Sequence, residues 1–205
     1  MLNLALQHLP LVAILRGVQP EEVEAVADRL YLEGFRVIEV PLNSPRALES
    51  ITRLARRMPT DALIGAGTVL SADAVTEVQA AGGRLIVMPH ADGAVIRLAK
   101  ARGMACIPGA ATPTEAFAAV QAGADALKLF PAELITPPVV KALRAVLPPT
   151  PHLLPVGGIS PDHLAAYQRA GATGFGLGSA LYSPGMSADV VGERARAFVQ
   201  AWRAL

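Results

Sequence analysis

One lysine of this chain lies inside a hydrophobic segment. Lys128 stands within Ala-Leu-Lys-Leu-Phe-Pro (126–131), a run with the character of a buried strand. Apolar surroundings disfavour the charged ammonium group and lower the pKa of a lysine. A neutral amine is a nucleophile that condenses with a ketone to form a Schiff base. The segment therefore predicts carbonyl chemistry at Lys128.

Lysine is scarce in this chain, which makes Lys128 stand out further. Lys100 and Lys141 are the only other lysines among 18 basic residues. Both lie in segments with helical periodicity and polar neighbours, so solvated helix faces explain them. A structural interpretation of Lys128 remains open at this point: its stem can pack in a wall while its head reaches solvent or pairs with a carboxylate.

Size and composition narrow the class of protein. The 205 residues, of which 52% are hydrophobic, predict a single domain spanning 1–205 with one large core. A net charge of +1 without a polybasic run gives no reason to expect nucleic acid or a membrane as partner. Cys106 is the lone cysteine, which fits a reducing compartment, and neither a signal peptide nor a membrane-spanning run is recognisable. We expect a cytoplasmic protein.

Short apolar runs alternate with helical segments along the whole chain. The runs cover residues 11–15, 37–40, 63–66, 85–88, 105–107, 126–129, 153–156 and 174–177. Helix starts are marked by Ser44-Pro45, Ser71, a capping box at 112–115 and Ser160-Pro161. Alternating β and α units indicate a parallel sheet, and eight strands favour an α/β fold of one (β/α)8 TIM barrel with short loops. No Gly-x-Gly-x-x-Gly follows the first run to support a dinucleotide-binding fold.

In such a barrel the carboxyl ends of the strands surround the active site. The residues at these ends are Arg16, Glu39, Thr68, Pro89, Gly109, Lys128, Gly157 and Gly178. Glu39 shares a strand face with Val37, so alternation points it inward if that face lines the barrel. A carboxylate beside an amine can move protons during carbonyl chemistry, although a buried ion pair without chemistry is the alternative.

Two further polar residues have open alternatives. Arg16 ends the first strand, where its donors could bind a carboxylate or a phosphate, or could neutralise Glu39. Thr68 either offers a hydroxyl to a ligand or caps the helix that starts near Ser71. The histidines are widely spaced and form no metal-binding pair, so we expect no metal site, although His90 could touch a substrate.

Two glycine-rich loops follow the last two strands. They read Val-Gly-Gly-Ile-Ser (156–160) and Gly-Leu-Gly-Ser-Ala (176–180). Each loop alone could be a simple turn. Barrels commonly bind phosphate after strands seven and eight, through backbone N–H groups and a helix N-terminus. As a pair in these positions the loops predict a phosphate site.

These motifs occur in a recognisable order. With Arg16, Glu39, Gly-Ala-Gly-Thr (65–68), Lys-Leu-Phe-Pro (128–131) and the two glycine loops, the chain resembles the 2-keto-3-deoxy-6-phospho-sugar-acid aldolases over nearly its whole length. The resemblance implies a class I aldolase that uses no metal or other cofactor. Its expected partner is a phosphorylated keto-deoxy sugar acid, which it would cleave to pyruvate and glyceraldehyde 3-phosphate, and its expected assembly is a homotrimer.

Residue by residue, the resemblance assigns roles to the strand ends. Lys128 becomes the Schiff-base lysine and Glu39 the general acid and base. The remaining roles are substrate carboxylate binding by Arg16 and Thr68, pocket walls from Pro89 and Phe130, and phosphate binding by Gly157, Gly158, Gly178 and Ser179.

Two positions bear on which sugar acid is bound. The gluconate branch of the family usually has Thr-Leu-Arg-Thr-Pro where this chain has Pro-Leu-Asn-Ser-Pro (41–45), and threonine where it has Val156. Both differences resemble the galactonate branch. Because a missing hydrogen bond in a site discriminates strongly, we expect Asn43 and Val156 to select the C4 epimer. Gluconate or dual specificity, a noncatalytic metabolite-binding barrel, and another phosphate-binding barrel enzyme are the alternatives.

Overall fold

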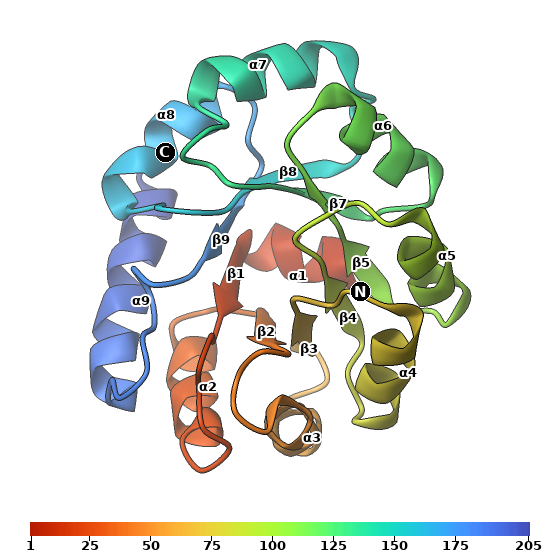
Figure 1. Ribbon diagram of the computed structural model, residues 1–205. Helices are drawn as coiled ribbons and strands as arrows, with labels where there is room; N and C mark the ends of the chain where they lie inside the picture. The colour runs from red at the N-terminus through yellow and green to blue at the C-terminus, as the bar shows by residue number, and fades with distance from the viewer.

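The computed structural model describes residues 1–205 as a ring of strands surrounded by helices (Figure 1). The strands are β1 Leu11–Ile14, β2 Val37–Pro41, β3 Leu63–Gly67, β4 Leu85–Val87, β5 Ala105–Ile107, β6 Gly109–Ala110, β7 Ala126–Leu129, β8 His152–Pro155 and β9 Phe175–Leu177. The helices are α1 Leu2–His8, α2 Val23–Leu32, α3 Ala47–Arg57, α4 Ala72–Ala80, α5 Gly93–Ala101, α6 Pro113–Gln121, α7 Pro137–Val146, the 3-10 turn η1 Pro161–His163, α8 Leu164–Arg169 and α9 Ala188–Arg203. None of them has the length and apolar composition needed to cross a membrane.

The strands close into a parallel barrel. One sheet has the order β5-β4-β3-β2-β1-β9 and the other the order β6-β7-β8. Two contacts join these sheets into a ring. A parallel bridge between Val156 and Gly176 joins β8 to β9. On the other side, the Lys128 N–H of β7 donates at 2.9 Å to the carbonyl oxygen of Pro108, the residue between β5 and β6. Pro108 separates β5 from β6, because a proline has no N–H for the ladder. With β5 and β6 counted as one interrupted strand, the predicted eight-stranded barrel is confirmed.

Several helix starts follow the sequence signals, and one does not. Thr112 and Glu115 form the predicted capping box of α6, and Ser71 Oγ accepts from the Ala74 N–H at the start of α4. The prediction that Ser44-Pro45 opens a helix is wrong in detail. Helix α3 begins after Arg46, whose φ is 45°, and Ser44 Oγ instead accepts from the Gly17 N–H at 2.9 Å.

Two apolar clusters lie on the two faces of the barrel wall. The larger, of 52 residues, fills the space between strands and helices, and the smaller, of 11, lies inside the ring. Helix α1, which the sequence patterns did not predict, supplies Leu2, Ala5 and Leu6 to the inner cluster, where Val12 and Val37 also lie. It sits behind the ring in Figure 1. The amino-terminal end of the barrel is therefore closed by apolar packing.

Candidate active site

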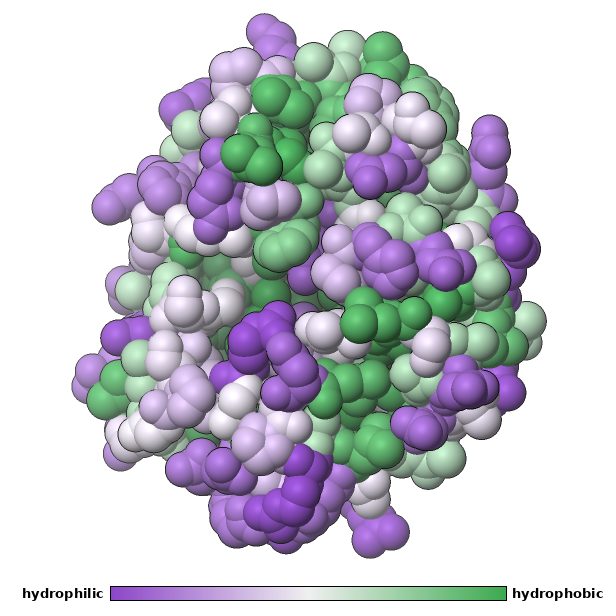
Figure 2. Space-filling model, viewed as in Figure 1, coloured by the Kyte–Doolittle hydropathy of each residue, from purple (hydrophilic) through white to green (hydrophobic).

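A cavity of about 420 Å³ lies at the carboxyl ends of the strands. Its wall comes from the ends of β1, β7, β8 and β9 and from the loops that follow them. Figure 2 looks onto this face, which is hollowed near its centre with hydrophilic side chains beside the hollow. The lining includes Lys128, Arg16 and the two glycine loops. The fold thus brings together residues that are far apart in the sequence.

Lys128 lies on the inner face of β7 and is 5% exposed. Its neighbours across the sheet are Gly109 on β6 and Leu154 on β8. Nζ lies 4.7 Å from the centroid of the Phe130 ring. Burial is the main cause that lowers the pKa of Lys128; the positive charge of Arg16 also lowers it, and Glu39 opposes both. The amine can therefore lose its proton more easily than a solvated lysine.

Glu39 lies on β2, where alternation with Val37 turns it into the barrel as predicted. It is 1% exposed, and its Oε2 has no hydrogen-bond partner. Burial raises the pKa of this carboxyl to about 7, although the positive charges of Lys128 and Arg16 oppose the shift. Both protonation states are therefore populated near neutral pH, as a group that donates and accepts protons requires.

The backbone of β3 makes room for this carboxyl. Gly67 follows Gly65 on β3 and is paired with Pro41 of β2. A Cβ atom built on Gly67 would lie 1.7 Å from Glu39 Oε2. Only glycine leaves that space, so the Gly-Ala-Gly pattern of the sequence has a direct steric cause.

Arg16 follows β1 and points its guanidinium to the neighbouring loops. Nη1 donates to Asn43 Oδ1 at 2.6 Å, and Nη2 donates to Thr68 Oγ1 at 3.5 Å. Thr68 has a φ of 54°, a left-handed conformation that is unfavourable for a threonine and that is often found at functional sites. Arg16 lines the main cavity, whereas Asn43 and Thr68 do not.

The two glycine loops lie side by side in the cavity wall, which contains all four predicted phosphate residues, Gly157, Gly158, Gly178 and Ser179. Gly157 and Gly158 have φ values of 118° and 59°, which favour glycine. The N–H groups of Gly158, Ser179 and Ala180 donate to no protein acceptor. Free N–H groups around a hollow form an anion-binding surface.

The other predicted wall residues separate into two groups. Phe130 and Val156 line the main cavity, and Val156 packs against the backbone of Gly176. Pro89 does not line the cavity; its carbonyl packs on the Cα of Gly109, where a Cβ would approach within 2.5 Å. His90 is exposed and also lies outside the lining. No group of three or more His, Cys, Asp or Glu side chains is placed to hold a metal ion.

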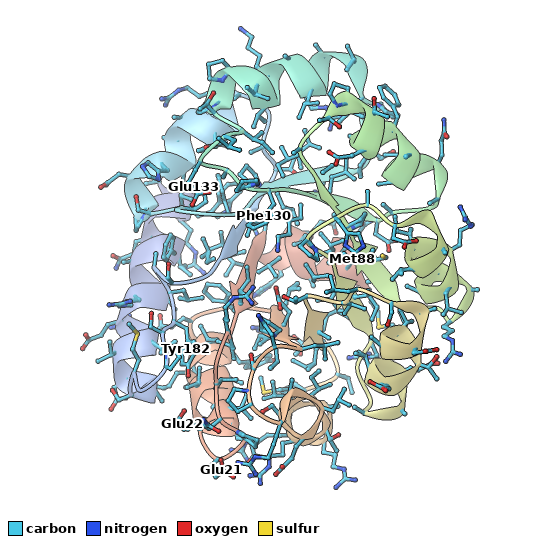
Figure 3. The ribbon with its side chains drawn as sticks, in the orientation of Figure 1. Glu21, Glu22, Met88, Phe130, Glu133 and Tyr182 are labelled. Atoms are coloured by element: carbon cyan, nitrogen blue, oxygen red, sulfur yellow. The ribbon has the colours of Figure 1, made fainter.

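Two ionisable residues of the cavity were missed by the sequence analysis. Glu133 lies on the loop after β7, against Gly157, and Tyr182 lies four residues after Gly178. Tyr182 is 2% exposed, its hydroxyl has no partner, and burial, together with Glu22, raises the pKa of the phenol to about 12. Figure 3 labels these residues. Their positions just after strand ends were the available signal.

These features define a class of protein. A (β/α)8 barrel with a buried amine and a carboxyl of raised pKa at its mouth is an enzyme scaffold able to form a Schiff base with a ketone. The chain belongs to the KDPG and KHG aldolase family, whose model matches residues 2–193. It is a lyase of the aldolase type, and the family predicted from its motifs is confirmed.

Relatives of this chain span nearly its whole length. It is 50% identical over 196 residues to a "Probable 2-dehydro-3-deoxy-6-phosphogalactonate aldolase" of Rhizobium meliloti, covering 96% of this chain and 92% of the relative. It is 46% identical over 195 residues to the "2-dehydro-3-deoxy-6-phosphogalactonate aldolase" of Escherichia coli, with 95% of both chains covered. A solved structure titled "Native KDPGal structure" superposes with a TM-score of 0.94, covering 96% of this chain and 95% of that one at 46% identity.

Proposed function

We propose that this protein is a class I aldolase that cleaves 2-dehydro-3-deoxy-6-phosphogalactonate to pyruvate and D-glyceraldehyde 3-phosphate. The observation that carries the proposal is Lys128, a buried amine at the floor of an open cavity, with Glu39 facing the same interior. The names of the two relatives above support this choice of substrate. Imine formation at Lys128 makes the substrate an electron sink for carbon–carbon cleavage.

The first half of the cycle builds the imine. The neutral amine of Lys128 attacks the C2 ketone, and protonated Glu39 gives a proton to the departing hydroxyl, which leaves as water. The product is a protonated imine and a Glu39 carboxylate. Because the pKa of Glu39 lies near 7, neither protonation state is costly to reach at neutral pH.

The second half breaks the C3–C4 bond. The Glu39 carboxylate takes the proton of the C4 hydroxyl, the C4 aldehyde leaves as glyceraldehyde 3-phosphate, and the bond electrons move onto the imine to give an enamine. Glu39 then returns its proton to C3. Water, deprotonated by the carboxylate, adds to the imine carbon and releases pyruvate, which restores both side chains.

Binding at the two ends of the substrate orients this chemistry. Arg16, with Thr68 beside it, binds the C1 carboxylate, for which a guanidinium offers two parallel donors. The phosphate binds to Gly157, Gly158, Gly178 and Ser179, whose loops provide free N–H groups and a hydroxyl. Pro89 supports the wall from behind through Gly109, and Phe130 and Val156 face the reacting carbons.

Epimer preference provides the test of this function. Val156 cannot donate to a C4 hydroxyl, so the site lacks one donor that a threonine would supply, and we expect faster turnover of the galactonate than of the gluconate epimer. Pyruvate release should be measured with both phosphorylated acids, at matched concentrations. Equal or faster turnover of the gluconate epimer would overturn the substrate assignment, and no pyruvate from either would overturn the activity and favour a noncatalytic barrel.

Two broader properties complete the proposal. A homotrimer fits the resemblance to this family, and one matched solved structure is described as fusing "symmetric oligomeric domains". A cytoplasmic location fits the lone cysteine, because Cys106 is a buried free thiol whose pKa burial raises to about 12. Sedimentation and cell fractionation are direct measurements of these two properties.

A further inference from the structure

The loop after β1 is attached to the loop after β2 at two points near the cavity. Asn43 Oδ1 accepts from Arg16 Nη1 at 2.6 Å, and Ser44 Oγ accepts from the Gly17 N–H at 2.9 Å. Ser44 is only 7% exposed, so the second bond is protected from water. Two neighbouring residues of one loop thus hold two neighbouring residues of the other.

A third contact extends the junction outward. Arg46 donates to both carboxylate oxygens of Glu21, at 2.6 and 2.8 Å. Glu21 is labelled in Figure 3 at the outer edge of this region, beside Glu22 at the start of α2. An exposed ion pair contributes little by itself. Its place next to the Asn43 and Ser44 contacts shows that the two loops are joined as a unit.

Asn43 reaches Arg16 from outside the cavity lining. Arg16 and Gly17 line the cavity, and Asn43 does not. The carbonyl oxygen of the Asn43 side chain is already used by Arg16. This arrangement favours an action of Asn43 through Arg16, in addition to the selection of the C4 epimer expected from the sequence.

We propose that Asn43 is a positioning residue that holds the Arg16 guanidinium for the substrate carboxylate, and that it acts on this carboxylate through Arg16. This inference rests on the proposed function. An arginine side chain loses rotamer entropy when it is fixed. A bond already made in the free protein removes part of that loss from the binding step.

The chemical type of residue 43 matters for this role. An amide oxygen accepts a hydrogen bond from the guanidinium without carrying a negative charge. An aspartate at the same place would form an ion pair with Arg16 and reduce the positive charge that the substrate carboxylate meets. A neutral acceptor therefore orients Arg16 and leaves its full charge available.

The test uses a half-reaction in which no C4 atom takes part. A protein that forms the pyruvate enamine exchanges the methyl protons of pyruvate with deuterium oxide, which proton NMR measures. Asn43→Ala should raise the pyruvate concentration for half-maximal exchange about tenfold, the effect expected for losing a hydrogen bond to a charged group. Asn43→Asp should raise it further, and the maximal exchange rate should change much less in both.

Three controls separate positioning from other roles. Pyruvamide has no carboxylate, so Asn43→Ala should exchange it as the wild type does. Asn3→Ala changes the only other asparagine, which is exposed on α1 at the closed end of the barrel, and should match the wild type. In an Arg16→Ala background, Asn43→Ala should cause no further loss, because the two residues act through one interaction.

The outcomes are distinguishable. A wild-type protein that does not exchange pyruvate would refute the proposed function itself. Wild-type exchange with unchanged pyruvate dependence in Asn43→Ala would overturn the positioning role while leaving the function intact. Equal loss with pyruvate and pyruvamide would also overturn it, because that pattern is a general disturbance of the site.

Discussion

At the scale of a single residue, the burial of Glu39 lowers the stability of the fold but suits a group that transfers protons. The carboxyl is 1% exposed, its Oε2 has no hydrogen-bond partner, and burial raises its pKa from 4.5 to about 7. A buried ionised group without a partner is unfavourable for folding. The same unfavourable environment gives the carboxyl the pKa that proton transfer near neutral pH requires.

Replacing this carboxyl should change how stability depends on pH. The pKa of Glu39 is higher in the folded protein than in the unfolded chain, so a rise in pH ionises the unfolded chain first. The wild type is therefore most stable below about pH 4.5, where the carboxyl is neutral in both states, and it loses this stability as the pH rises to 7 and above. A shift of this size corresponds to about 3 kcal/mol. Glu39→Gln should therefore resemble the wild type near pH 4 and exceed its free energy of unfolding by about 3 kcal/mol at pH 8.5, measured by urea denaturation. An equal difference at the two pH values would contradict this explanation.

Strand β3 shapes the site at the scale of one element. Its glycines let β2 and β4 approach, and Gly67 faces the Glu39 carboxyl, where a Cβ would lie 1.7 Å from Oε2. Under the proposed function, the strand therefore contributes to catalysis by leaving space for the Glu39 carboxyl. Sequence analysis found the Gly-Ala-Gly-Thr motif but assigned no function to its second glycine.

A methyl group at this position should displace the acid. Gly67→Ala should lower kcat by about 10²-fold or more, because losing a positioned general acid or base typically costs that much. Because Lys128 remains in place, the Gly67→Ala protein should lose less of its labelling by pyruvate and borohydride than of its kcat. Gly192→Ala is the matched control: Gly192 lies inside α9 with its nearest neighbour atom 3.5 Å from a built Cβ, so activity should be unchanged. Full activity of Gly67→Ala would refute the steric role of Gly67.

Element positions were predictable from the sequence, whereas contacts between loops were not. The alternation of apolar runs and capping signals located all eight barrel strands, and period-two alternation placed Glu39 inside. The local sequence also marked Ser44 as a helix start. In the structure its hydroxyl binds Gly17, 27 residues away, and Asn43 next to it binds Arg16. Such bonds depend on the register between neighbouring strands, which no local pattern encodes.

The barrel as a whole separates a closed end from a reactive end. Helix α1 packs Leu2 and Leu6 into the inner cluster, while the opposite end is open above Lys128. A TIM barrel generally places stability at the amino-terminal face and catalysis at the carboxyl face. The short sequence of α1 shows no distinctive pattern, so this closure was visible only in the fold.

Stability and activity should respond separately at the two ends. Leu6→Ala removes a side chain that is 2% exposed and should lower the free energy of unfolding by about 2–5 kcal/mol while KM stays unchanged. Leu4→Ala is the matched control, because Leu4 is 72% exposed on the same helix and should change stability by less than about 0.5 kcal/mol. Denaturant unfolding with parallel kinetics measures both. A large rise in KM for Leu6→Ala would show that the two ends are coupled.

The most direct measurement of the central claim is reduction of the protein with borohydride in the presence of pyruvate, followed by peptide mass mapping. A buried, readily deprotonated amine at the cavity floor predicts one stable pyruvyl adduct on the peptide that contains Lys128, no adduct at Lys100 or Lys141, and none in Lys128→Met. An unlabelled Lys128 peptide, or labelling that persists in Lys128→Met, would contradict the assignment of this lysine as the nucleophile.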